Sequence, residues 1–184
     1  MKVLIGCEKS GVVRDAFLEQ GHDAWSCDLL PSENPSNRHI QDDVRYVLKS
    51  ESWDMLMVAH PPCTRLCNSG VRWIKKPNEE KTVKDMIQEL VEGSQFFAEM
   101  WNADVPRIAV ENPVMHKHAK KRIQRFSEIE FPWKPSQTVQ PWQFAIEEDG
   151  PDNVKKRTCF WLRDLPKLTA TGTLDGSTAR ADIH

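Results

Sequence analysis

The sequence predicts an α/β fold, in which a doubly wound, mostly parallel sheet forms a single domain. Short apolar runs typical of buried strands alternate with amphipathic helical patterns from the first residue onward. The chain has 184 residues, of which 39% are hydrophobic and 28% charged, enough for one domain with its own core. We expect that domain to cover residues 1–168, followed by a polar tail over residues 169–184 that is loop or disordered.

The spacing of apolar residues predicts the individual elements. Five runs indicate parallel strands, at 2–6, 23–27, 39–42, 54–59 and 107–110. Helices are predicted at 13–20, 44–49 and 79–101. A further helix is expected to start with Asn112 as its N-cap and Pro113 in its first turn, and to run to residue 126. Two more strands are predicted beyond several prolines, at 138–140 and 158–162.

The composition excludes several classes of protein. The 25 Lys+Arg and 27 Asp+Glu residues give a net charge of −2, which excludes a nucleic-acid binder that acts through bulk positive charge. No apolar run approaches the roughly 20 residues of a membrane span, so no membrane partner is expected. The five cysteines are an odd number and do not indicate a disulfide scaffold, which favours a cytoplasmic protein. No second Cys or His pair completes a zinc site with Cys63 and Cys67, so no metal is expected.

The loop after the first predicted strand is a candidate ligand-binding segment. Gly6, Ser10 and Gly11 are small and allow a ligand to approach the backbone at a helix N-terminus. The acidic Glu8 suits a cationic or hydroxyl-bearing ligand. An ordinary tight turn between strand and helix would explain the same residues.

Carboxylates follow the second and third predicted strands. Asp28 lies about twenty residues beyond the first loop, where nucleoside-binding sheets place the acid that holds ribose hydroxyls. Asp43 comes at the same edge after the third strand. Taken alone, Asp28 could simply end its strand, and Asp43 could cap the helix that follows it.

The turn Pro61-Pro62-Cys63 ends the clearest buried strand. Two prolines make the strand exit rigid and fix the direction of the next side chain, so Cys63 is a candidate nucleophile, active as its thiolate. The alternative is a buried structural cysteine. Glu111 follows the next parallel strand, where its carboxyl group could bind the ring nitrogen and amine of a nucleobase, or stabilise the dipole of the following helix.

Basic residues cluster in two segments near the same edge. Lys117, Lys120 and Lys121 belong to a run that also holds Arg122 and Arg125 and contains no acid; it is a candidate for phosphate contacts or a solvated helix face. The second cluster is Lys155-Lys156-Arg157. Trp73, beside Arg72 and two lysines, is a candidate for base stacking.

Together these motifs resemble the cytosine-carbon-5 DNA methyltransferases, and most closely their small phage and prophage members. Residues 3–17, with Gly6, Ser10, Gly11 and Arg14, resemble the first motif of that family, with Cys7-Glu8-Lys9 in place of its glycine-rich stretch. Residues 61–70 keep the spacing of the Pro-Pro-Cys-Gln-x-Phe-Ser-x-x-Gly motif, with Thr64 for Gln and Cys67 for Ser. Residues 111–113 resemble Glu-Asn-Val, and Lys155-x-Arg157 resembles Gln-x-Arg-x-Arg.

The resemblance implies a Rossmann-like fold that binds S-adenosylmethionine, with DNA as the partner. The cofactor contacts would come from Gly6, Glu8, Ser10, Gly11, Asp28, Asp43 and Pro61. Catalysis would fall to Cys63 as nucleophile, Glu111 as general acid and Arg157 as the neutralising cation. Nucleic-acid contacts would come from Arg65, Lys117, Lys120, Lys121 and Lys155.

About twenty residues follow Pro166, too few for the family's separate target-recognition region and its final cofactor motif. Either the chain is truncated, or the protein is a minimal version that cannot choose a duplex sequence by the usual means. Single-stranded targets therefore become more plausible, since extruding a base from a duplex costs a few kcal/mol. Two rivals stay open. One is a methyltransferase-fold protein that binds nucleic acid or cofactor without turnover. The other is an enzyme that modifies a free pyrimidine nucleotide.

Overall fold

The computed structural model describes residues 1–74 and 81–181, except for the side chains of Ser69, Arg72 and Trp73. These residues form an α/β fold around a seven-stranded sheet in the order β3-β2-β1-β4-β5-β7-β6. The strands are β1 (Lys2–Gly6), β2 (Asp23–Asp28), β3 (His39–Gln41), β4 (Met55–Val58), β5 (Arg107–Pro113), β6 (Gln137–Val139) and β7 (Thr158–Arg163). The predicted α/β class and mostly parallel sheet are thus confirmed.

Pairing between neighbouring strands divides the sheet into two parts. The pairs β2–β3, β1–β2, β1–β4 and β4–β5 are parallel, whereas β7 pairs antiparallel with both β5 and β6. The strand order reverses between β1 and β4, and open parallel sheets bind their ligands outside the carboxyl ends of the strands at such a switch point. The loops after β1, β2, β4 and β5 therefore start at the edge where a ligand is expected.

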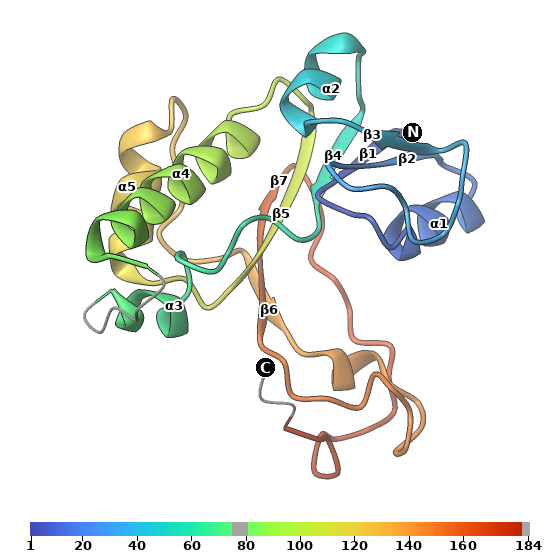
Figure 1. The fold of residues 1–184 in the computed structure, drawn as a ribbon. Coiled ribbons are helices and arrows are strands. Elements are labelled where there is room, and N and C mark those ends of the chain that lie inside the picture. The colour runs from blue at the N-terminus through green and yellow to red at the C-terminus, as the bar shows by residue number, and fades with distance from the viewer. Residues whose placement is uncertain (75–80, 182–184) are drawn as a thin grey trace.

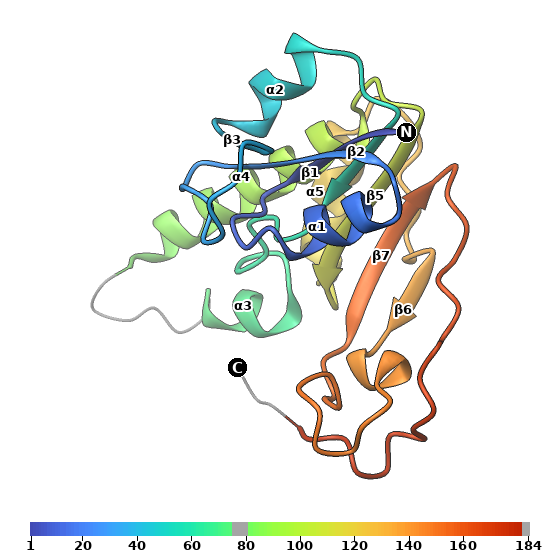
Figure 2. The ribbon, with the colours of Figure 1, turned by 90° about the vertical axis from the view of Figure 1, so that its right-hand side faces the viewer.

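The helices are α1 (Val12–Glu19), α2 (Val44–Ser50), α3 (Asn68–Trp73), α4 (Val83–Trp101) and α5 (Lys117–Phe126), and a short 3₁₀ helix, η1, spans Pro141–Phe144. Helix α1 covers one face of the sheet, which we call the α1 face, and α4 and α5 cover the other, the α4 face (Figure 1; Figure 2). Helix α2 also packs on the α4 face, through Val44 and Val47. None of the described helices is long and apolar enough to cross a membrane.

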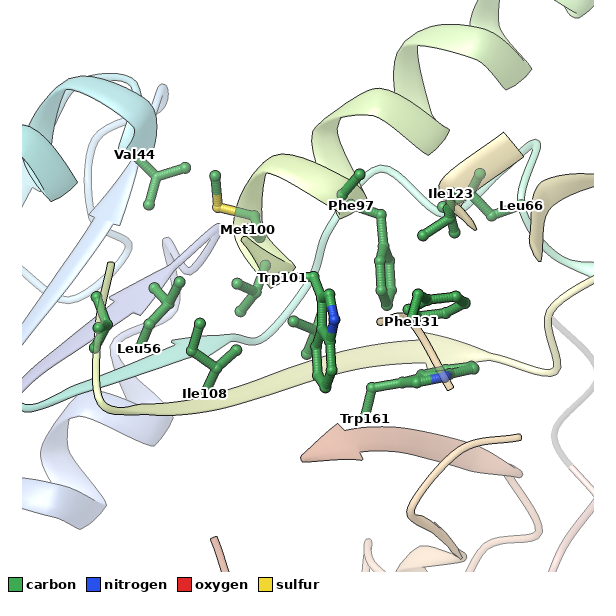
Figure 3. Close-up of a cluster of buried hydrophobic side chains, with 14 of the residues drawn as sticks. Val44, Leu56, Leu66, Phe97, Met100, Trp101, Ile108, Ile123, Phe131 and Trp161 are labelled. Atoms are coloured by element: carbon green, nitrogen blue, oxygen red, sulfur yellow. The ribbon is translucent and has the colours of Figure 1, made fainter. Parts of the chain in front are cut away.

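Most of the core lies on the α4 face. Phe97 of α4, Phe131 and Trp161 of β7 pack together there, and their ring centroids are 5.5–5.9 Å apart (Figure 3). Ile123 of α5 joins the same buried cluster. Burial of large aromatic rings stabilises this face strongly, because each removes roughly 150–250 Å² from water. A smaller cluster on the α1 face is built around Val3 and Ile5 of β1, Ala24, Met55, Ala59 and Ala109.

The predicted helix start at Asn112-Pro113 is wrong. Both residues belong to β5, which pairs with β7 as far as Pro113 opposite Thr158, and α5 starts only at Lys117 with His116 as its N-cap. Pairing with a strand from much later in the sequence overrides the local capping signal. Helix α4 starts at Val83, where Thr82 and Asp85 form a reciprocal capping box. The prediction began four residues earlier, at Glu79, which lies outside the described residues.

The tail is irregular from residue 169 to residue 181 apart from one isolated bridge, yet it is bound to the rest of the chain. The Lys155 amide donates to the Arg180 carbonyl at 2.7 Å, and the Arg180 amide donates to the Asn153 carbonyl at 3.0 Å. The Gly172 amide donates to the Gln143 carbonyl at 2.9 Å. These contacts attach the tail to η1 and the loop before β7 (Figure 1).

Candidate functional site

The loop after β4 is bonded to the segment that follows β5. The Asn68 amide donates to the Val114 carbonyl at 3.1 Å, and the His116 amide donates to the Leu66 carbonyl at 2.8 Å. Within the loop, a Cβ on Gly70 would lie 1.4 Å from the Thr64 carbonyl oxygen, so only glycine permits this close approach. These contacts hold the loop that carries Cys63 against the end of β5, where Glu111 lies.

Cys63 and Glu111 influence each other's charge. Burial raises the pKa of the Cys63 thiol, and the Glu111 carboxylate and Cys67 raise it further. Burial also raises the pKa of Glu111 from 4.5 to about 7, so its carboxyl group holds a proton over much of the neutral range. A carboxylic acid that stays protonated near pH 7 beside a thiol is a candidate general acid.

Lys156 is the cation that acts on both groups. Its charge lowers the pKa of Glu111 and that of Cys63, against the larger effect of burial. Lys156 lies two residues before β7 starts at Thr158, and β7 pairs with the segment of β5 that carries Glu111.

Arg157 lies on the other face of the sheet. It is in phase with Cys159 and Trp161, which are buried in the cluster on the α4 face. It lines a cavity there together with Lys120 of α5. The structure therefore does not bring the expected catalytic cation, Arg157, to Cys63 and Glu111. Lys156, rather than the expected Lys155 or Arg157, is thus the member of the Lys155-Lys156-Arg157 cluster that acts on Cys63 and Glu111, and no pattern in the sequence distinguishes it from its two neighbours.

The carboxyl ends of β1 and β2 and the start of α2 meet at Cys7. Burial raises the pKa of the Cys7 thiol to about 12, with further contributions from Asp28 and Asp43, so both carboxylates lie near it. The Asp43 carboxylate accepts the Arg45 amide and pairs with the Arg45 guanidinium, which lowers its pKa. Asp28 is half-buried, and its Oδ1 accepts the Leu30 amide at 3.0 Å.

The first loop serves the structure of α1. Glu8 is fully buried, and its carboxylate accepts the amides of Val13 at 2.6 Å and Arg14 at 3.2 Å, as well as the Ser10 hydroxyl at 3.3 Å. Gly11 caps the helix with φ of +80°. The carboxylate of Glu8 thus occupies the N-terminus of α1, where we expected ligand contacts from Glu8 and Ser10. A Cβ on Gly6 would lie 2.8 Å from Val44, so this glycine allows α2 to pack on β1.

A cavity of about 460 Å³ lies beside the Cys63 loop. Pro62, Thr64 and Arg65 line it on one side, and Gly93 and Phe96 of α4 on the other, whereas Pro61 is buried below. Its cations are paired with acids. The Arg65 guanidinium donates to Glu89 at 2.7 Å, and Lys81 also pairs with Glu89. Arg65, expected to contact nucleic acid, is thus engaged with α4.

The remaining basic candidates lie on α5 and before β7. Lys117 and Lys121 are exposed on α5, and Lys155 is exposed before β7. Trp73 ends α3, but its side chain lies outside the described part of the structure. Among the described residues the cysteines form no disulfide, and no group of three or more His, Cys, Asp or Glu side chains there could hold a metal ion.

No family model and no curated protein matches this chain.

Proposed function

We propose that this protein transfers a methyl group from S-adenosylmethionine to carbon 5 of cytosine in DNA, through a covalent bond between Cys63 and the base. One observation carries the proposal: a thiol and a largely buried carboxyl group lie together at the carboxyl ends of β4 and β5. The carboxyl group has a pKa of about 7, and Lys156 lies within range of both. Strand order adds support, because the site adjoins the switch point between β1 and β4.

The chemistry of the base explains why these groups are needed. Carbon 5 of cytosine is a weak nucleophile. When the Cys63 thiolate forms a bond to carbon 6, the protonated Glu111 donates its proton to ring nitrogen 3, and carbon 5 becomes the nucleophilic end of an enamine. After methylation, a water molecule removes the proton from carbon 5, the 5,6 double bond reforms, the thiolate leaves carbon 6 with the electron pair of the broken bond, and the proton on nitrogen 3 returns to the Glu111 carboxylate. Lys156 stabilises the thiolate and the negative charge near the base.

The residues at the ends of β1 and β2 fit the cofactor in part. Asp28 is half-buried, and within the described residues its Oδ2 has no hydrogen-bond donor, which suits a carboxylate that accepts ribose hydroxyls. Glu8 does not fit, because the α1 amides already satisfy it. When bound, S-adenosylmethionine supplies the methyl group; Asp28 would hold its ribose, and the rigid Pro61-Pro62 turn would fix Cys63 beside it.

Trapping of the covalent bond tests the proposal. In an oligonucleotide that carries 5-fluorocytosine, carbon 5 has no proton to lose after methylation, so the bond to Cys63 should persist through denaturation. We would incubate single- and double-stranded versions with the cofactor and look for a shifted band on a denaturing gel. Cys63→Ser should abolish the adduct, whereas Cys67→Ser, a matched change in the same loop, should retain most of it. Trapping that survives the loss of Cys63 would falsify its assignment as nucleophile.

A binding protein without turnover is the second candidate, and the raised pKa of the Cys63 thiol favours it, because a protonated thiol is a poor nucleophile. Calorimetry separates the two. The enzyme should bind S-adenosylmethionine, and Asp28→Ala should weaken that binding about tenfold, as expected for one or two lost hydrogen bonds to a charged group. Cofactor binding without any adduct on either type of strand would favour the binding protein.

A further inference from the structure

A second cavity, on the α4 face, has the size and the lining of a nucleotide site. It measures about 430 Å³ and lies between the start of α5, β6, η1 and the first half of β7. Cavities of roughly 300–1,000 Å³ hold small organic ligands. It lies on the face of the sheet opposite to Glu111, because its lining residues Cys159 and Trp161 belong to the α4-face core, whereas Glu111 pairs with Phe160, which alternates with them.

The charge inside this cavity is not neutralised. Lys120 and Arg157 line it, and no Asp or Glu is among the described residues that do so. Neither cation forms an ion pair within the described part of the chain; Lys120 lies over the ring of Trp133, with Nζ 5.5 Å from the ring centroid. The cavity beside Cys63 differs in this respect, because there Glu89 pairs with both Arg65 and Lys81.

This concentration of positive charge does not follow from the composition, since the whole chain has a net charge of −2. Two unpaired cations that face one cavity repel each other, and an anion between them would remove that repulsion. Arginine offers two parallel N–H donors, which match two oxygens of a phosphate group, and lysine adds a point charge.

The rest of the lining suits more than a bare anion. Thr138, Gln140 and Gln143 contribute hydroxyl and amide groups that can both donate and accept hydrogen bonds. The buried Trp161 and Cys159 supply an apolar wall. Polar groups beside an apolar wall are what a sugar and a base require once a phosphate is fixed.

We propose that this cavity binds a nucleotide, with its phosphate held between Lys120 and Arg157. The phosphate belongs either to a free nucleotide or to the backbone of a strand, and both present the same chemistry to the two cations. The inference goes beyond methyl transfer and does not depend on it, because Lys120 and Arg157 take no part in the chemistry proposed for Cys63 and Glu111.

The test is calorimetry with four probes: thymidine, thymidine 5′-monophosphate, the dinucleotide thymidylyl-thymidine, and inorganic phosphate. A phosphate-bearing nucleotide should bind at least tenfold more tightly than thymidine and than inorganic phosphate. Tighter binding of the monophosphate supports a free nucleotide as the natural ligand, and tighter binding of the dinucleotide supports a strand. Equal binding of thymidine and both phosphate-bearing nucleotides overturns the proposal, as does no binding at millimolar concentration.

Variants locate the site. Arg157→Gln and Lys120→Gln should each weaken nucleotide binding at least tenfold, and Arg157→Lys, which keeps the charge, should lose less than Arg157→Gln. Lys134→Gln is the matched control, because Lys134 is exposed and precedes Pro135, which lines the cavity, but does not line it itself; its binding should stay within twofold of wild type. Circular dichroism and thermal melting check that each variant is folded. An equal loss in Lys134→Gln would reduce the effect to general electrostatics and overturn the assignment.

Discussion

The two faces of the sheet at β5 and β7 treat charge in opposite ways. On the face with Glu111, a carboxyl group, a thiol and Lys156 lie together, and burial shifts the pKa of both acids upward. On the α4 face, Lys120 and Arg157 share a cavity and form no ion pair among the described residues.

Two neighbours in the chain mark the difference. Lys156 and Arg157 both precede β7, yet Lys156 acts on Cys63 and Glu111, whereas Arg157 lines the α4-face cavity with Cys159 and Trp161. Adjacent basic residues that lead into a strand can therefore serve two separate sites.

Loss of the Glu111 carboxyl group should have the largest effect. Glu111→Gln removes the acid that protonates ring nitrogen 3, and a positioned general acid typically contributes about 10²–10⁴-fold to the rate. Methyl transfer measured with radiolabelled cofactor should fall by that factor. A change at the neighbouring Asn112, such as Asn112→Asp, is unsuitable as a control because Asn112 is fully buried. Arg157→Gln, on the other face of the sheet, is the control and should leave the rate of methyl transfer within a few-fold of wild type.

The same variant should change how stability depends on pH. Glu111 has a pKa of about 7 in the folded chain and an ordinary value of 4.5. Its folded form therefore holds a proton that the unfolded chain releases, and wild type loses stability as the pH rises from 4.5 to 7. At about 1.4 kcal/mol per pKa unit, the loss amounts to about 3 kcal/mol.

Glu111→Gln cannot ionise and should be spared this loss. Urea denaturation at pH 5 and at pH 8 measures this loss. The free energy of unfolding of wild type, relative to that of the variant, should be lower at pH 8 than at pH 5. A constant difference would mean that Glu111 is solvated and would weaken its role as general acid.

Lys156→Gln should have an intermediate effect, no more than about tenfold on the rate, because Lys156 is exposed and solvent screens its charge. The pH profile is the sharper measurement. The charge of Lys156 lowers the pKa of both Glu111 and Cys63, so its removal should shift both limbs of the profile to higher pH. Arg157→Gln should shift neither limb. Matching shifts in the two variants would contradict the assignment of the two residues to separate faces.

Salt dependence of nucleic-acid binding should show the smallest effect. We expect the basic residues of α5 to contact phosphates on the surface next to the α4-face cavity. Replacing Lys117, Lys120, Lys121 and Arg122 by Gln should flatten the plot of log affinity against log salt, by about 0.7–0.9 for each lost contact. Fluorescence anisotropy with a labelled oligonucleotide measures the slope. An unchanged slope would identify these side chains as an ordinary solvated helix face.

The order and type of most elements were predictable from local patterns. Buried parallel strands read as continuous apolar runs, and the face of α4 was evident in its period of three to four residues. The errors fall where distant segments pair. Asn112-Pro113 has the local chemistry of a helix start, but β7 pairs with it from more than forty positions away and keeps it extended.

The sequence by itself determined that Cys63 and Glu111 end adjacent strands at one edge, since the Pro-Pro turn and the apolar runs are local features. It also placed basic residues near that edge. Only the tertiary structure decided which of them meets the acid, because the antiparallel pairing of β7 on β5 brings the segment before β7 beside the end of β5 from more than forty positions away. It likewise decided that Glu8 caps α1, since burial and two amide bonds are properties of the packed chain.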